Sequence, residues 1–165
     1  MIKLGKKEAF NKSLLENSFK SVYERDENGR TVLHYAVDAK TVRLLAEKGA
    51  NVNAVDVGGY TPLHLAVTAQ NLENVKELIR SGANVNAEEY GSKNMPLHLG
   101  CMIGEKEIVE ELVEAGGEIE KEDKFGLKAM DYAKNSKEVT EVLKKETDRI
   151  EKLFEKRRGK PSTRG

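Results

Sequence analysis

Three histidines recur along the chain, each at the end of a four-residue motif that reads TVLH at 31–34, TPLH at 61–64 and MPLH at 95–98. Histidine is a common zinc ligand, so a shared metal site is the first chemistry to consider. Equivalent residues on packed helices lie about 8–10 Å apart, whereas zinc holds its ligands at about 2 Å. We therefore expect no metal at His34, His64 and His98. Each imidazole should instead hydrogen-bond backbone or the capping Thr and tie one unit of the chain to the next.

Cys101 is the only cysteine, and it is a second candidate for chemistry. It falls where Val37 and Val67 fall in the other motifs, so we expect a small buried hydrophobe rather than a nucleophile. The glycine-rich stretches lack the spacing of a P-loop or a dinucleotide fingerprint. No nucleophile–base set or paired carboxylates stand out either. We expect no enzyme activity, no cofactor and no small-molecule substrate.

The histidine motifs are part of a longer repeat. A degenerate fourth copy reads KAMD at 128–131, and the first residues of successive copies are 30, 34 and 33 positions apart. A second marker returns at the same interval, as GANVN at 49–53, GANVN at 82–86 and GGEIE at 116–120. Such self-similarity is typical of a stack of equivalent structural units, which offers surface to a partner rather than a catalytic pocket.

With both markers in this order, the chain resembles the ankyrin-repeat family over about residues 26–145. The closest agreement is in residues 56–88, where TPLH-x-A and GA-x-VN occur in one unit. The resemblance implies a β-turn, two antiparallel helices and a finger-like hairpin in each repeat, and a role in binding other proteins. We expect an all-α repeat solenoid with short β-hairpins, three clear repeats and degenerate N- and C-terminal caps.

Residues 56–88 carry local signals for this fold. Thr61 and Pro62 suit the start of a first helix, and the apolar residues from Leu72 to Ile79 follow a helical period. Gly49, Gly82 and Gly116 suit left-handed helix ends. Met95 replaces the capping Thr, and such a loss typically costs about 1 kcal/mol. The predicted organisation is one domain at 1–155, with an N-terminal cap at 6–25, repeats at 26–55, 56–88 and 89–122, a last repeat with a capping helix at 123–155, and a basic disordered tail at 156–165.

The composition of the chain restricts the classes of partner that we expect. The chain has 28 basic and 28 acidic side chains, so we expect no general attraction to nucleic acid or to an acidic membrane. The lone cysteine and the absence of long apolar runs favour a soluble, cytoplasmic protein, and we expect a monomer.

Charge is distributed unevenly along the chain. Residues 89–122 hold 9 acidic and 3 basic side chains, which fits a solvated face or a binding surface for a basic partner. The tail, with 5 basic residues, is compatible with nuclear import or a nucleic-acid contact.

In the ankyrin family, partners bind the hairpin tips and the concave face of the first helices. The matching positions here include several apolar residues, and aromatic residues and Met are enriched at binding hot spots. The alternative is that these side chains pack on neighbouring hairpins and helices. We expect a protein-interaction module that could act as an inhibitor, adaptor or effector; the alternative is a structural or self-associating repeat. The candidate partner-binding residues are Arg30, Asp38, Val57, Tyr60, Thr68, Tyr90, Lys93, Met102, Ile103, Phe125 and Leu127.

Overall fold

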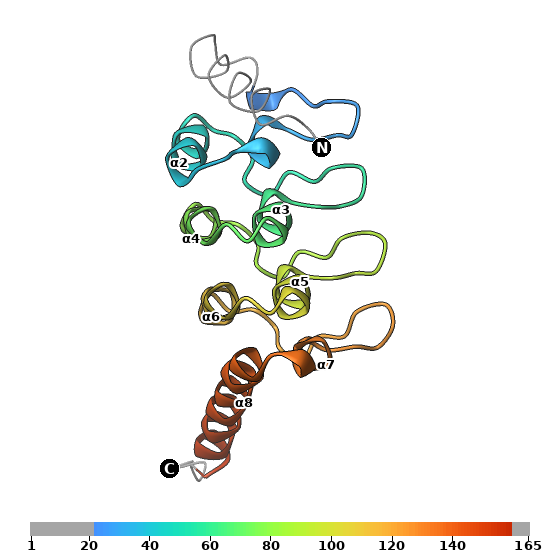
Figure 1. The fold of residues 1–165 in the computed structure, drawn as a ribbon. Coiled ribbons are helices and arrows are strands. Elements are labelled where there is room, and N and C mark those ends of the chain that lie inside the picture. The colour runs from blue at the N-terminus through green and yellow to red at the C-terminus, as the bar shows by residue number, and fades with distance from the viewer. Residues whose placement is uncertain (1–21, 160–165) are drawn as a thin grey trace, which may run out of the picture.

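The computed structural model describes residues 22–159, which form a stack of four helical units (Figure 1). Hairpin loops project from one side, the first helices lie in the middle, and the second helices form the outer layer on the other side. The first helices are η2 (Val32–Tyr35), α3 (Pro62–Thr68), α5 (Pro96–Ile103) and α7 (Ala129–Tyr132), the last followed by η3 (Ala133–Asn135). The second helices are α2 (Ala39–Glu47), α4 (Leu72–Arg80), α6 (Lys106–Glu114) and α8 (Lys137–Arg158).

The all-α repeat fold is confirmed. Residues 22–159 contain no β-strand, so the predicted β-hairpins are tight turns closed by backbone bonds such as Asp56 N–H to Tyr60 O and Gly59 N–H to Asp56 O, both at 3.0 Å. The core is a column of aliphatic side chains between the two helix layers, with Leu63, Val75 and Leu97 fully buried. Gly49, Gly82 and Gly116 all have φ near +90°, as predicted for residues that end a helix in the left-handed conformation.

The first repeat has a shorter first helix than the second and third repeats. Seven positions separate Thr31 from the α2 cap Asp38, against ten between Thr61 and the α4 cap Asn71. These three missing residues remove the last turn of the helix, so only the 3-10 helix η2 forms. Val37 is consequently exposed, unlike Val67 and Cys101, which are buried at the equivalent predicted positions.

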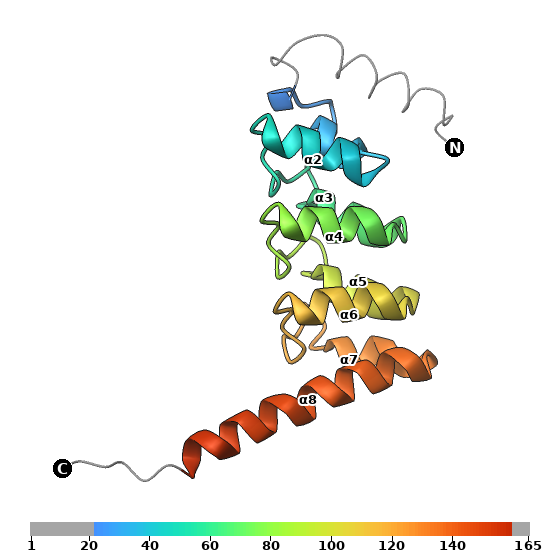
Figure 2. The ribbon, with the colours of Figure 1, turned by 90° about the vertical axis from the view of Figure 1, so that its left-hand side faces the viewer.

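The last second helix is the longest. α8 begins at the cap Ser136 and its first turns cover the fourth repeat through Val139 and Leu143, which are fully buried. It continues to Arg158, so residues 156–158 are helical and the prediction of a disordered tail beginning at 156 was wrong there. Its C-terminal half extends beyond the stack (Figure 2). Residues 160–165 of the tail, and the predicted N-terminal cap up to residue 21, lie outside the described residues.

Candidate interaction surface

The motif histidines connect successive repeats. The Nδ1 atoms of His34, His64 and His98 accept the backbone N–H of the residue that precedes their own helix, at 3.0 to 3.1 Å. Because Nδ1 accepts, Nε2 carries the proton and donates to a carbonyl of the next repeat. The prediction that each imidazole ties one unit to the next is therefore confirmed. The three accepting carbonyls are Tyr60 O, Asn94 O and Lys121 O, at 2.9 to 3.1 Å.

This arrangement uses both nitrogens of each ring within the fold. Burial lowers the pKa of His34 and His64, against the opposing effect of the carbonyl bonds, so both rings stay neutral near neutral pH. Within residues 22–159, no three His, Cys, Asp or Glu side chains gather as metal ligands would. Cys101 is buried as predicted, and burial raises the pKa of its thiol to about 12. A thiol with that pKa stays protonated and is a poor nucleophile at neutral pH.

An acidic residue folds each hairpin. Asp56 Oδ1 accepts the N–H groups of Gly58 and Tyr60, both at 2.9 Å, and Asp26 and Asp123 bind their own hairpins in the same way. Burial acts to raise the pKa of Asp56, but the hydrogen bonds from Tyr60, Arg30 and Gly58 outweigh it and hold this pKa below its ordinary value. These carboxylates stay charged, and each fixes the shape of its hairpin.

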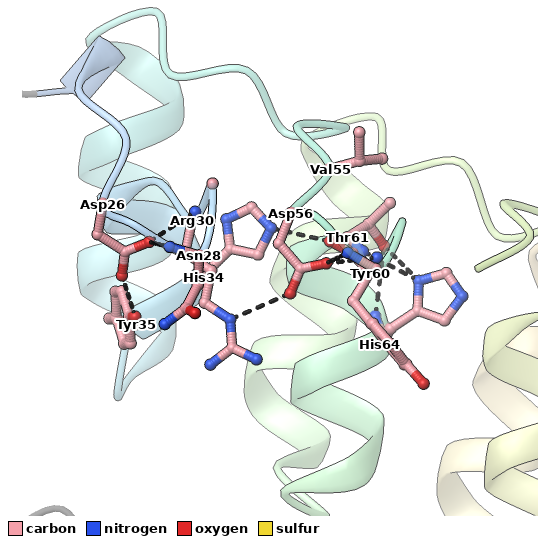
Figure 3. A network of polar contacts seen from close by, with 12 residues as sticks. Asp26, Asn28, Arg30, His34, Tyr35, Val55, Asp56, Tyr60, Thr61 and His64 are labelled. Atoms are coloured by element: carbon pink, nitrogen blue, oxygen red, sulfur yellow. Dashed lines mark hydrogen bonds and ion pairs between the residues drawn. The ribbon is translucent and has the colours of Figure 1, made fainter. Parts of the chain in front are cut away.

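The first two hairpins are also joined by side chains (Figure 3). Arg30 Nε donates to Asp56 Oδ2 at 3.1 Å, and the hydroxyl of Tyr35 donates to Asp26 Oδ2. Tyr60 stands edge-on to the His64 ring, with centroids 5.7 Å apart. Sequence reasoning missed these carboxylates as a set. The sequence pattern that could have revealed them is an acidic residue five or six positions before each helical motif, at 26, 56, 89 and 123.

Backbone bonds run from hairpin to hairpin at the tips. Val57 N–H donates to Asn28 O at 3.0 Å, Tyr90 N–H to Gly58 O at 2.8 Å, and Lys124 N–H to Ser92 O at 2.8 Å. The four hairpins thus form one hydrogen-bonded row. A row of this kind holds the tip side chains at fixed spacing.

The apolar residues predicted at the tips are solvent-exposed. Val57, Tyr90 and Phe125 lie on three successive hairpins with 71%, 64% and 67% of their surface exposed. Tyr90 also rests against the neighbouring hairpin, because a Cβ at Gly59 would lie 2.6 Å from its ring. The structure therefore combines both predictions for Tyr90: one side packs on the adjacent hairpin and the rest faces solvent.

The other predicted residues divide into two groups. Met102, Leu127, Lys93 and Thr68 are exposed, whereas Ile103 is partly buried against the core and Tyr60 is half-buried. Asp38 differs from its prediction: it caps α2 by accepting the N–H of Thr41 at 2.7 Å. The shortened first repeat brings Asp38 to this cap, away from the end of a first helix where Thr68 and Met102 lie.

A pocket of about 410 Å³ lies between the first and second repeats. Thr68 and Ala69, which have no counterpart in the shortened first repeat, line one side of it. Tyr35 and Val37 line the other side, and Arg30 also contributes. Two predicted residues, Arg30 and Thr68, thus share a concave feature that sequence reasoning did not foresee.

The stacked helical pairs, the projecting hairpins and the hydrogen bonds of His34, His64 and His98 between repeats (the histidine joints) define a helical repeat solenoid, and comparison with known proteins identifies the family. The family model described as ankyrin repeats (3 copies) matches residues 1–89, so the chain belongs to the ankyrin-repeat family. Ankyrin repeats are generally protein–protein interaction modules without catalytic activity of their own. Beyond residue 89 the structure adds two further helical pairs, α5 with α6 and α7 with α8.

Several curated proteins share part of this chain. It is 42% identical over 74 residues to a B-cell lymphoma 3 protein homolog of Mus musculus, across 42% of this chain and 16% of that protein. It is 36% identical over 90 residues to an ankyrin repeat protein of Variola virus, across 51% of this chain and 16% of that protein. A palmitoyltransferase of Lachancea kluyveri is 38% identical over 72 residues, across 42% of this chain and 10% of the enzyme. The chain thus spans a small part of each relative.

No helix within residues 22–159 is both long and apolar enough to span a membrane.

Proposed function

We propose that this chain is a non-enzymatic module that binds another protein through its hairpin surface. We define the hairpin surface as Val57, Tyr90 and Phe125 at the tips, with Tyr60 and Leu127 on the same hairpins and Met102 on α5. Inhibitors, adaptors and effectors can all use such a surface. We also propose that the module works in the cytoplasm, because the one cysteine is buried and offers no disulfide.

The observation that carries this proposal is the exposure of Val57, Tyr90 and Phe125 on three successive tips. Large apolar side chains usually lie inside a protein, and exposed groups of them are typical of interaction sites. The tip-to-tip backbone bonds support the proposal because they order the surface before a partner arrives. A preordered surface loses less conformational entropy on binding.

The pocket beside Thr68 gives the hairpin surface a concave neighbour. Its lining combines apolar side chains such as Leu65 and Val37 with the guanidinium of Arg30. Buried anchors that fill pockets contribute most of the affinity in many interfaces. We propose that a partner segment crosses the tips and places one apolar side chain in this pocket.

The test is affinity capture from cells with the parent chain and a Tyr90→Ala/Phe125→Ala variant. Both side chains are exposed, so the variant should fold with an unchanged melting temperature. A Tyr23→Ala chain is the matched control, because Tyr23 is equally exposed and its hydroxyl lies near Gly49, away from the tips. We expect a partner that the parent and the control retain and the double variant loses. A partner that all three chains retain would place the binding site elsewhere.

A further inference from the structure

The C-terminal half of α8 presents an apolar face with no covering element among residues 22–159. Leu153 and Phe154 are 52% and 56% exposed, and every residue from 151 to 159 is exposed. The first half of the same helix buries Val139 and Leu143 against the fourth repeat. The predicted capping helix within residues 123–155 includes Leu153 and Phe154, but both are exposed, and the C-terminal half of α8 extends beyond the stack (Figure 2).

Two shallow depressions meet at Ile150. One, of about 220 Å³, is lined by Ile150, Leu153, Phe154 and Arg157. The other, of about 570 Å³, lies between α8 and the loop after α6, with Val113, Gly117 and Ile119 in its lining. Ile150 belongs to both, so one apolar strip runs from the end of α6 to the tip of α8.

Charge differs between the two ends of this strip. Three acidic residues and one basic residue, Glu118, Glu120, Glu146 and Lys121, border the end near α6, so this end is acidic on balance. Lys156, Arg157 and Arg158 form the last turn of α8 at the other end. A surface with an acidic end, an apolar centre and a basic end is complementary to itself after a two-fold rotation.

We propose that two copies of this chain pair through this strip, with their α8 helices antiparallel and the two-fold axis near Ile150. In this arrangement Leu153 and Phe154 of one copy enter the depression beside Ile119 of the other. Arg157 of each copy then approaches Glu118 of its partner. This pairing replaces the monomer expected from composition, and the small strip predicts a weak, reversible dimer.

The dimer leaves both hairpin surfaces free, because the tips and α8 lie on different parts of the stack (Figure 1). Two hairpin surfaces on one particle would bind a repeated or dimeric partner with avidity. The dimer can nevertheless be tested independently of the proposed partner binding, since the strip and the hairpin surface share no residue.

An acidic membrane is the other occupant that a basic helix tip suggests. The acidic end of the strip opposes it, because Glu118 and Glu146 border the same strip and would be repelled by anionic lipid. Charge complementarity therefore favours a second copy over a lipid surface.

The test is sedimentation equilibrium of the full chain across concentration. We expect a monomer–dimer equilibrium that weakens with added salt, because part of the attraction is between exposed charges. Leu153→Ser/Phe154→Ser should raise the dimer dissociation constant about tenfold or more. The matched control, Tyr90→Ser/Phe125→Ser, removes equally exposed rings from the tips and should leave the dimer unchanged. A chain that stays monomeric at high micromolar concentration, or a dimer that survives the α8 variant, overturns the proposal.

Charge reversal tests the geometry. Arg157→Glu and Glu118→Arg should each weaken the homodimer, because each places like charges together twice. A mixture of the two variants should recover dimerisation, since the heterodimer contains one native pair and one reversed pair. Failure of the mixture to recover overturns the antiparallel arrangement. Binding of the chain to phosphatidylserine vesicles, lost in Leu153→Ser/Phe154→Ser while the chain in solution stays monomeric, would assign the strip to a membrane.

Discussion

The second and third repeats both consist of a hairpin and two helices but begin their first helices differently. Thr61 before α3 offers a hydroxyl that accepts the N–H of His64, whereas Met95 before α5 is fully buried and offers none. α5 still begins at Pro96, because Met95 N–H donates to the ring of His98 at 3.0 Å, as Thr61 N–H does to His64. The comparison shows that the histidine is the constant part of this cap, and the hydroxyl is an addition.

The same two repeats also differ in their turns. The third hairpin is one residue longer, and Glu89 takes the place of Asp56 at its base. Between the helices, Gln70 has φ +56° in the second repeat, and Gly104 has φ +85° at the equivalent position of the third. The pair of helices is maintained while the residues that support its turns vary. Exchanging these residues between the two repeats therefore measures how much each contributes to the free energy of unfolding.

The largest expected effect comes from the core that both repeats share. Leu78 in α4 and Leu112 in α6 occupy equivalent buried positions. Leu78→Ala and Leu112→Ala should each lower the free energy of unfolding by about 2–5 kcal/mol, because each leaves a cavity. Urea denaturation followed by circular dichroism measures both losses. Leu153→Ala is the control and should change stability by about 0.5 kcal/mol or less. Clearly unequal losses at Leu78 and Leu112 would show that the repeats are not energetically equivalent.

The hairpin carboxylates should have the next largest effect. Glu89 accepts the N–H groups of Gly91, Ser92 and Asn94 at 2.6 to 3.1 Å while almost fully buried. Glu89→Asp should cost about 1–3 kcal/mol, because the shorter side chain cannot reach every N–H group of the longer loop.

The reverse exchange, Asp56→Glu, tests whether side-chain length is matched to loop length. It should also destabilise, because the extra methylene group must fit a hairpin that Asp56 already closes. Thermal melts of both variants measure the losses. A neutral Glu89→Asp would mean that solvent satisfies the loop as well as the carboxylate does.

The histidine joints should make a smaller contribution to the free energy of unfolding, and this contribution should depend on pH. Burial lowers the pKa of His34 and His64 below the usual value of about 6.5, so the unfolded chain binds more protons than the folded chain as the pH falls. Their contribution to stability is complete above about pH 6.5 and is lost progressively below it, toward their folded pKa values. The carboxylates Asp26, Asp56 and Asp123 also have lowered pKa values, but they titrate below about pH 4.

Denaturation at steps between about pH 7.5 and about pH 5 follows this contribution. His34→Gln/His64→Gln should be less stable at neutral pH and show a shallower slope in this window. An unchanged slope would mean that other groups carry the pH dependence.

The sequence predicted the repeats because their markers are local: the TPLH motif begins a helix and the GANVN motif follows one. It also predicted the histidine joints and the buried Cys101. It missed features that depend on how far an element extends relative to its neighbours. The exposure of Leu153 and Phe154 depends on where α8 passes the last repeat, and the pocket beside Thr68 depends on the three residues that the first repeat lacks. The position of Asp38 depends on the same three residues: they are missing before Asp38, so Asp38 caps α2 and does not lie at the end of a first helix.

The smallest expected effect tests the left-handed residue between the helices. Gln70 with φ +56° bears a steric cost of about 1–2 kcal/mol that glycine avoids. Glycine, however, loses about 0.5–1 kcal/mol more in conformational entropy on folding. The difference favours Gln70→Gly by about 0.5 kcal/mol, and Gly104→Gln should lose a similar amount. A Cβ at Gly104 would lie 3.7 Å from Ser136 Cβ, an ordinary contact, so the loss should come from the backbone and not from a clash. Paired thermal melts should therefore shift by similar amounts in opposite directions, and a loss in both variants would mean that the Gln70 side chain makes a stabilising contact that outweighs its strained backbone.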